Sequence, residues 1–150
     1  TGQVTSSGSS ATSYTGVLGP SETNAEVIAS GSLSNFGTNT LGAVLRWTDN
    51  NDFYKAYITG SNLVISKKVG GTVTKLKSVS FTATANTFYT IDFSVVGTTL
   101  TASVWQGNNS PTSVTTTDSS ISSSGFCGVL VYFTTSGVSA NFNSFEAISH

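Results

Sequence analysis

Apolar side chains recur at every second position through most of this chain, and this period limits the fold more than any other feature. In residues 89–95, Tyr89, Ile91 and Phe93 alternate with polar side chains, and residues 100–105 repeat the pattern. Successive side chains of a β-strand point to opposite faces, so this alternation gives a strand one apolar and one polar face. No stretch carries the apolar stripe of an amphipathic helix. The pattern predicts an all-β protein.

The alternating runs follow one another at the short, regular spacing that is typical of a β-sandwich or β-barrel. Two β-branched runs flank Gly70-Gly71, which predicts a hairpin because a type I′ turn needs a positive φ at both central residues. The strands predicted in this way are residues 14–18, 25–33, 41–48, 53–59, 63–69, 72–77, 89–95, 100–105, 126–134 and 138–147. With no linker or internal repeat in view, residues 1–150 are predicted to form one domain.

Composition excludes several classes of protein. Charged residues make up 9% of the chain and the net charge is −1, so a basic surface for nucleic acid or for an anionic membrane is not expected. No apolar run approaches the ~20 residues that span a bilayer. The single Cys127 rules out an internal disulfide. A chain rich in Ser, Thr, Asn and Gly and poor in Lys and Glu is typical of bacterial extracellular β-rich modules, so an extracellular location is predicted.

One segment carries a family resemblance. Residues 42–54 read Gly-Ala-Val-Leu-Arg-Trp-Thr-Asp-Asn-Asn-Asp-Phe-Tyr. This segment resembles the concanavalin A-like, or laminin G-like, jelly-roll modules of bacterial secreted proteins, in which a glycine, small apolar residues, Leu-Arg-aromatic, Asp-Asn and an aromatic-Tyr pair often follow one another. Similar segments elsewhere spread the resemblance over residues 25–147: residues 88–91, 97–102, 125–128 and 142–145, with Asp118.

The resemblance implies an antiparallel two-sheet β-sandwich of the jelly-roll type, with a concave sheet or its rim loops as the binding surface. The acidic first strand common in the family is absent, because the chain opens at Thr1-Gly2-Gln3-Val4, which leaves open a sandwich that lacks its first strand. The family also implies a structural calcium ion, the one cofactor to consider. Asn143 stands where the closing strand often has an aspartate that helps to hold this ion.

Catalytic residues are not apparent in the sequence. A glycoside hydrolase needs two carboxylates about 5–10 Å apart, and the seven acidic residues form no alternating array along a strand. Asp92 is expected to be a lone, solvent-facing carboxylate. The one histidine, His150, is the last residue, and Cys127 lies in a predicted buried strand without a base beside it. We therefore predict no catalytic residues.

Aromatic residues beside polar groups are the sharper signal. Sugar rings pack their C–H faces on aromatic rings, while their hydroxyl groups bond to polar side chains. Trp105 follows Thr101 and Ser103 on the polar face of its strand, so its indole is predicted to point outward. Trp47 is predicted to pack with Ala43 and Leu45. The predicted ligand-binding residues are Arg46, Tyr57 and Trp105, with Asp49 and Asn51 at the rim.

Some of these residues allow a second interpretation. Trp47 and Tyr57 equally suit the core or edge of a sandwich, and Arg46 suits an ion pair with an inner acid. Residues 49–52 (Asp-Asn-Asn-Asp) offer oxygen ligands to Ca²⁺, or alternatively form an Asx-rich turn between two strands. The sequence thus leaves a metal site open.

These observations predict a non-catalytic carbohydrate-binding module of an extracellular bacterial protein. Its expected partner is a glycan or polysaccharide, with no nucleic acid and no membrane insertion, and the module is expected to be a monomer or part of a multidomain chain. A structural or adhesive spacer domain without a sugar site is the alternative. A glucanase-like glycoside hydrolase is the third and weakest hypothesis.

Overall fold

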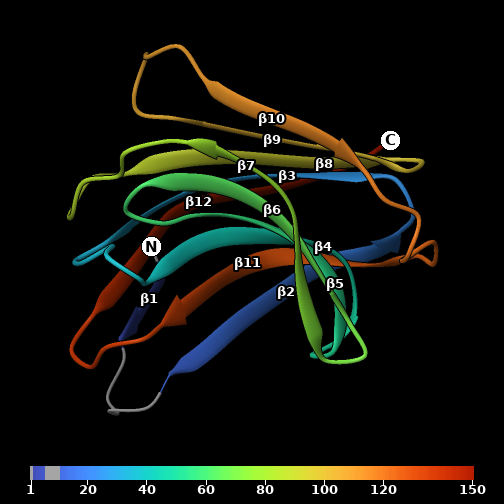
Figure 1. Cartoon of the computed structure of the whole chain (residues 1–150), viewed down its shortest axis with the longest axis horizontal. Helices are drawn as coiled ribbons and strands as arrows, with labels where there is room; N and C mark the ends of the chain where they lie inside the picture. Colours follow the sequence, from blue (N-terminus) through green and yellow to red (C-terminus); the bar gives the residue numbers. More distant parts are fainter. Residues whose placement is uncertain (1, 6–10) are drawn as a thin grey trace.

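The computed structural model describes residues 2–5 and 11–150, in which two β-sheets pack face to face (Figure 1). The described strands are β1 (Gly2–Thr5), β2 (Thr12–Glu22), β3 (Ala25–Leu33), β4 (Thr40–Asp49), β5 (Asp52–Ile58), β6 (Asn62–Val69), β7 (Thr72–Ser80), β8 (Tyr89–Val96), β9 (Thr99–Trp105), β10 (Thr112–Thr117), β11 (Gly125–Phe133) and β12 (Ser139–Ser149). The described residues contain no helix long and apolar enough to cross a membrane.

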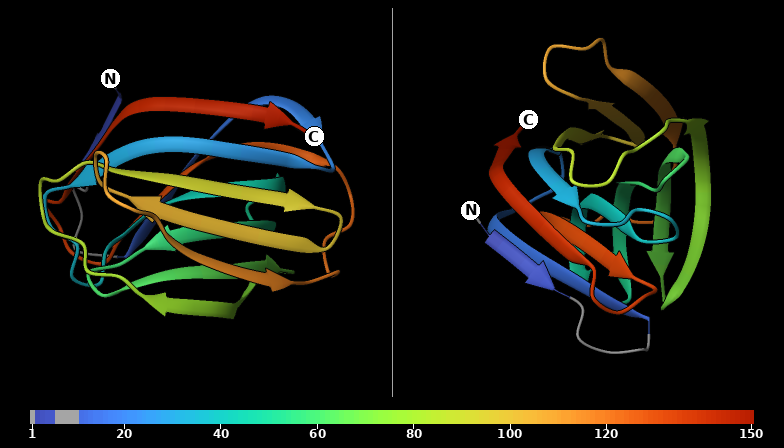
Figure 2. Two further views of the ribbon diagram at one scale, coloured as in Figure 1. Left: turned by 90° about the horizontal axis from the view of Figure 1, so that it is seen from above. Right: turned by 90° about the vertical axis from the view of Figure 1, so that its left-hand side faces the viewer.

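The two sheets have six strands each, and all neighbouring strands are antiparallel. The first sheet has the order β1-β12-β3-β8-β9-β10 and the second has the order β2-β11-β4-β5-β6-β7. Figure 2 shows the two layers from two further sides, with β3 and β8 in one layer and β5 and β6 in the other. The prediction of an antiparallel two-sheet β-sandwich is confirmed.

The core lies between the sheets and is formed by the apolar residues that occupy every second position of the strands. Val27, Ile91 and Phe93 point inward from the first sheet, and Leu45 and Ile58 point inward from the second. None of these side chains is more than 2% exposed. Fully burying one such side chain is worth about 1.5–3 kcal/mol, so the apolar face of each strand holds the two sheets together.

The hairpin predicted at Gly70-Gly71 is also confirmed. Both glycines have positive φ angles, 55° and 83°, and Val69 pairs with Thr72 across the turn. A side chain with a Cβ rarely adopts such angles, and glycine adopts them without steric cost. The turn joins β6 to β7, the strand at one edge of the second sheet.

Two strands carry too little pattern to be predicted. β10 has one buried apolar residue, Val114, among threonines and a serine, and it forms because its backbone pairs with β9. β1 pairs Gly2–Thr5 with Ser139–Phe142 of β12, so an edge strand is present at the start of the chain. The rest of the weakly patterned opening segment, Thr1 and residues 6–10, lies outside the described residues.

Candidate functional site

A hollow on the outer face of the second sheet gathers aromatic, cationic and hydroxyl side chains. Tyr54, Ala56 and Ile58 of β5 point into the core, so Phe53, Lys55 and Tyr57 between them point outward. The hollow has a volume of about 650 Å³. We call it the outer groove and define it by Thr40, Phe53, Lys55, Tyr57, Lys68 and Tyr132.

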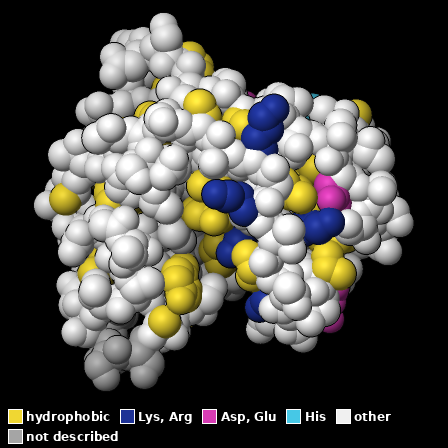
Figure 3. Space-filling view, in the orientation of Figure 1, with side chains coloured by type: hydrophobic (Ala, Val, Ile, Leu, Met, Phe, Trp, Pro, Cys, Tyr) yellow, Lys and Arg dark blue, Asp and Glu magenta, His cyan; other side chains and the backbone are white. Residues whose placement is uncertain are grey.

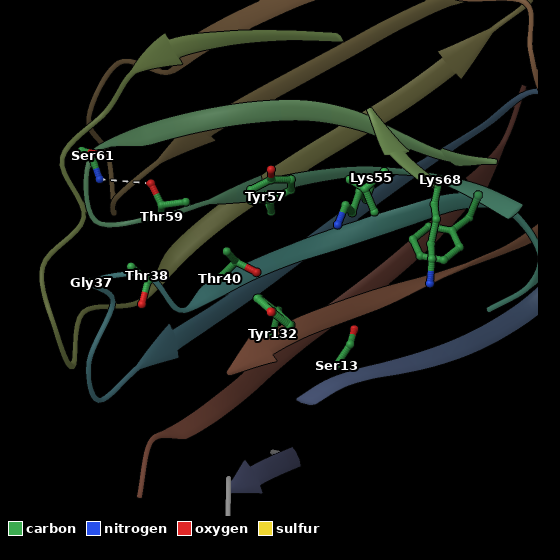
Figure 4. A pocket seen from close by; sticks show the side chains of 12 residues that line it. Ser13, Gly37, Thr38, Thr40, Lys55, Tyr57, Thr59, Ser61, Lys68 and Tyr132 are labelled. Carbon is green, nitrogen blue, oxygen red and sulfur yellow. Dashed lines mark hydrogen bonds between the residues drawn. The ribbon is translucent and has the colours of Figure 1, made fainter. Parts of the chain in front are cut away.

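Strand register explains how residues far apart in sequence come to line the outer groove. Residues that pair directly across antiparallel strands share one face of the sheet. Phe53 pairs with Lys68 of β6, and Thr40 of β4 pairs with Tyr132 of β11. Figure 4 shows Thr40, Lys55, Lys68 and Tyr132, which come from β4, β5, β6 and β11, around one shared space. The groove is therefore a product of sheet pairing and belongs to no single sequence motif.

Tyr57 contributes an aromatic ring to this lining, and Gly42 makes its position possible. Gly42 pairs with Tyr57, and a Cβ on residue 42 would lie 2.7 Å from the Tyr57 Cβ and 2.2 Å from the Ala56 carbonyl oxygen. The Tyr57 hydroxyl lies 3.4 Å from Ser66 Oγ, so the half-buried ring extends toward β6. The sheet thus presents a supported aromatic ring to the groove.

Two lysines give the outer groove a positive charge. Lys55 Nζ lies 5.1 Å from the centroid of the Tyr57 ring, and Lys68 Nζ lies 5.8 Å from that of Phe53. Lys68 also donates a hydrogen bond of 2.6 Å to the Asn50 carbonyl. Burial lowers the pKa of Lys55, and the positive charge of Lys68 lowers it further. Figure 3 shows lysines beside hydrophobic side chains on this hollowed face.

Arg46, predicted as a ligand-binding residue, is buried. Its side chain is 2% exposed, and its guanidinium group donates to the carbonyls of Thr23 (2.7 Å), Ile121 (2.6 Å) and Gly97 (2.7 Å). Burial lowers the pKa of Arg46. The acceptors are three loop carbonyls, one for each guanidinium nitrogen, and the inner acid suggested as its partner is not among them. Arg46 therefore holds one end of the sandwich together.

A β-bulge at Arg46 also changes the face on which Trp47 lies. Arg46 has a positive φ of 49°, and the register of β4 shifts against β5 between Leu45 and Asp49. Leu45 belongs to the core, whereas Trp47 packs with Val44 and Phe53 on the outer face. The prediction that Trp47 packs with Ala43 and Leu45 was wrong, because the extra residue of the bulge reverses the alternation.

The predicted rim residues form an Asx turn. Asp49 Oδ1 accepts a hydrogen bond of 2.6 Å from the amide of Asn51, and Asp52 Oδ1 accepts one of 3.0 Å from the amide of Gly70. Both Asp49 and Asn51 are exposed at the end of the β4–β5 hairpin. The turn interpretation of residues 49–52 is therefore the one that the structure supports.

Trp105 lies on the other sheet. It pairs with Thr90 of β8 and faces outward with Thr101 and Ser103, because Ala102 and Val104 between them belong to the core. The prediction of an outward indole agrees with this partly exposed position. However, Tyr57 lies on the outer face of the second sheet, so the sandwich separates the two rings. The five predicted residues do not form one surface.

Five residues of the outer groove were not predicted as binding residues: Thr40, Phe53, Lys55, Lys68 and Tyr132. A signal for Phe53 was present, because it alternates with Tyr57 along one strand. Neither Thr40 nor Tyr132 could have been found without knowing that β4 pairs with β11.

Asp92 is less isolated than its sequence position indicated. It faces outward from the first sheet, where burial and then the nearby Glu26 carboxylate together raise its pKa to about 6. Glu26 also lies 2.7 Å from His150 Nε2. The expectation of a lone carboxylate was wrong, because β3 and β8 pair and bring the two acids together. The residues that line the outer groove include no carboxylate.

The side chains present do not fit a calcium site. Asp49 and Asp52 already accept hydrogen bonds from backbone amides, and Asn143 is exposed in a bulge of β12. Asp118 Oδ2 lies 2.7 Å from Lys67 Nζ, so an ammonium group occupies the place beside that carboxylate. Across residues 2–5 and 11–150, no group of three or more His, Cys, Asp and Glu side chains could hold a metal ion.

Comparison with known proteins rests on structure. No protein-family model and no curated protein match the sequence. A carbohydrate-binding module, CBM66, from Bacillus subtilis is similar, with a TM-score of 0.79 and 15% identity over 98% of this chain and 86% of that one. A legume lectin-like domain from Entamoeba histolytica has a TM-score of 0.63 and 14% identity, over 99% and 83% of the two chains.

The fold is a concanavalin A-like jelly roll. Xylan beta-1,4-xylosidase from Bacillus halodurans C-125 contains the same fold, with a TM-score of 0.70 and 15% identity. The match covers 97% of this chain but 32% of the xylosidase chain, so the chain spans about a third of that enzyme. Jelly-roll modules thus occur both as binding modules and as parts of longer enzymes.

Proposed function

We propose that this jelly roll is a non-catalytic carbohydrate-binding module and that it binds glycans in the outer groove. The observation that carries the proposal is the Tyr57 ring, which lies in a hollow among hydroxyl and ammonium groups. A sugar needs this combination, because its C–H face packs on an aromatic ring while its hydroxyl groups exchange hydrogen bonds with polar side chains.

The size and lining of the outer groove support the proposal. A volume of about 650 Å³ accommodates a short stretch of oligosaccharide. Thr40 and Tyr132 offer hydroxyl groups on one side, and Lys55 and Lys68 offer N–H donors on the other. The likeness to CBM66 and to a lectin-like domain supports sugar binding in general. The residues that line the outer groove support this face of the molecule as the binding surface.

The protein that carries this module is proposed to be an extracellular bacterial protein. Its Ser- and Thr-rich, weakly charged composition supports this location, as does the likeness to a carbohydrate-binding module of Bacillus subtilis. Fractionation of the source cells, with an antibody against the domain, tests it. Detection in the culture medium or at the cell surface is expected, and retention in the cytoplasm would contradict the proposal.

A glycan panel followed by titration of the best ligand tests the binding function. Tyr57→Ala is expected to lower affinity about tenfold or more, by analogy with aromatic stacking on nucleic-acid bases. Tyr57→Leu fills part of the same space but offers no ring face, so it separates stacking from packing. Trp105→Ala on the other sheet is the matched control and is expected to bind as the wild type does. Thermal melts confirm that each variant is folded.

Each alternative predicts a different result. If Trp105→Ala lost binding and Tyr57→Ala kept it, the site would lie on the first sheet. If no glycan bound to the folded wild type, a structural or adhesive spacer domain would be the better description. Release of reducing sugar from xylan or β-glucan would show that the module is an enzyme.

A further inference from the structure

The positive charges of this chain are distributed unevenly. The chain has six Lys and Arg residues. Arg46 is bound to three carbonyls, and Lys67 forms an ion pair with Asp118. The other four are lysines on the adjacent strands β5, β6 and β7: Lys55, Lys68, Lys75 and Lys77. Over the described part of the chain, none of these four forms an ion pair with a carboxylate.

Sheet register places three of these lysines on the groove side of the sheet. Lys55 pairs with Ser66, and Ser66 pairs with Lys75, so these residues form one row across three strands. Lys68 lies in the next row, between Phe53 and Val73. The positive charge of Lys68 acts on Lys55, and such repulsion between like charges is unfavourable unless an opposite charge compensates it.

The neighbouring acids form no ion pair with these lysines over the described part of the chain. Asp49 and Asp52 lie in the adjacent β4–β5 hairpin, where their carboxylates accept hydrogen bonds from the amides of Asn51 and Gly70. Lys68 donates to a neutral carbonyl. The one described partner of the Lys55 ammonium is the face of the Tyr57 ring, whose centroid lies 5.1 Å from Nζ.

An anionic group on the ligand would complete this arrangement. Charge-assisted hydrogen bonds are roughly twice as strong as neutral ones, so an anion is a better partner for Lys55 than the ring face. In a uronic acid the carboxylate is attached directly to the sugar ring and lies at its edge. A uronate stacked on Tyr57 would therefore hold its carboxylate beside the ring, at the position from which Lys55 and Lys68 can donate.

We propose that the outer groove selects glycans that contain uronic acids, with Lys55 and Lys68 binding the carboxylate groups and Tyr57 binding the sugar ring. This proposal rests on the proposed glycan-binding function of the same groove. It goes further by assigning the charge of the ligand. Because the net charge of the chain is −1, attraction to an acidic polymer would have to come from this local cluster.

A matched pair of polymers tests the charge requirement. Polygalacturonate and its fully methyl-esterified form share one backbone and differ in the carboxylate charge. We expect the folded wild-type domain to bind the acidic form about tenfold more tightly, with affinity that falls as NaCl rises from about 50 to about 500 mM. Equal or tighter binding of the ester, or of neutral xylan, would overturn the uronate proposal and leave the glycan-binding function standing.

Matched lysine variants locate the effect. Lys55→Met and Lys68→Met each remove one charge from the groove, whereas Lys77→Met removes the same charge from outside its lining. We expect about a tenfold loss for each groove variant and less than a twofold change for Lys77→Met. Equal losses in all three variants would mean a general charge effect and would overturn the proposal. Melting temperatures verify that the variants are folded.

Two further outcomes are distinguishable. Tighter binding of a sulfated neutral polymer than of polygalacturonate at equal charge density would overturn the assignment to carboxylate. If the wild-type domain bound none of the polymers, acidic or neutral, and no member of the glycan panel, the proposed function and this inference would fail together.

Discussion

Replacing Arg46 tests whether this residue acts as a structural clamp or as a ligand contact. Arg46→Met keeps most of the aliphatic stem but removes the three hydrogen bonds to the carbonyls of Thr23, Gly97 and Ile121. These carbonyls belong to three separate loops at one end of the sandwich. The variant therefore asks what joining those loops contributes to stability.

The expected magnitude follows from the burial of each acceptor. The hydrogen bond to Ile121 is buried, and leaving a buried carbonyl without its donor costs about 1–3 kcal/mol. The bonds to Thr23 and Gly97 are partly buried, so water replaces the donor and each loss costs about 0.5–1 kcal/mol. Together these losses amount to about 2–5 kcal/mol, which lowers the melting temperature of a domain of this size by about 5–15 °C.

Thermal and urea unfolding of the wild type, Arg46→Met and Arg46→Lys measure the effect. A lysine keeps the charge but has one donor group, which cannot reach all three carbonyls, so we expect an intermediate loss of stability. Glycan affinity, measured well below the melting temperature, is expected to stay within about twofold of the wild type. A melting temperature within about 2 °C of the wild type for Arg46→Met, together with lost glycan affinity, would refute the structural role and return Arg46 to the binding site.

Three further predictions concern single ionisable groups. Burial would raise the pKa of Asp118, but hydrogen bonds from Lys67, the Ser120 amide and Tyr54 outweigh it and hold the pKa at about 2. The stability that this group contributes is present above the unfolded pKa of about 4 and is lost as the pH falls toward 2. In urea unfolding between pH 6 and pH 2, Asp118→Asn should therefore remove about 1–2 kcal/mol of the pH-dependent part of the free energy of unfolding. The same loss of stability toward low pH in the variant as in the wild type would contradict this. The pKa of Asp92, raised to about 6, means that the folded state holds a proton that the unfolded chain has released. The free energy of unfolding should therefore fall as the pH rises from about 4 to about 6. Asp92→Asn should raise it by about 1 kcal/mol at pH 7.5 and leave it unchanged at pH 4. An equal increase at both pH values would rule out the charge explanation. Cys127 is 2% exposed, and burial raises its pKa, so a thiol reagent should label it slowly in the native protein and rapidly in urea; fast native labelling would show that this strand opens readily.

Much of the architecture follows from the sequence because local patterns report the face of each residue. Tyr89, Ile91 and Phe93 alternate with polar residues, and all three are buried in the core. The turn at Gly70-Gly71 follows from the need for two positive φ angles. These features depend on neighbours along the chain, so they can be read without knowing the tertiary structure.

Which residues meet in space depends on how the strands pair and where they bulge. A single positive φ at Arg46 shifts the alternation of β4, which moved Arg46 into the interior and Trp47 onto the outer face. A bulge adds one residue without a strong sequence signal, so the period-two alternation no longer predicts which face the residues beyond it occupy. The assignment of Tyr57 and Trp105 to opposite sheets likewise depends on which strands pair.

The outer groove shows the same division most clearly. The alternation along residues 53–59 is enough to show that Phe53 and Tyr57 share one face of a strand, and the sequence also shows that lysines cluster in residues 55–77. It could not determine that Tyr132, some 75 residues away from Tyr57, lines the same hollow, because this requires β11 to pair with β4 and β4 with β5. Strand pairing across long sequence distances is chosen by the free energy of the whole sandwich, and the local pattern of one strand does not encode it.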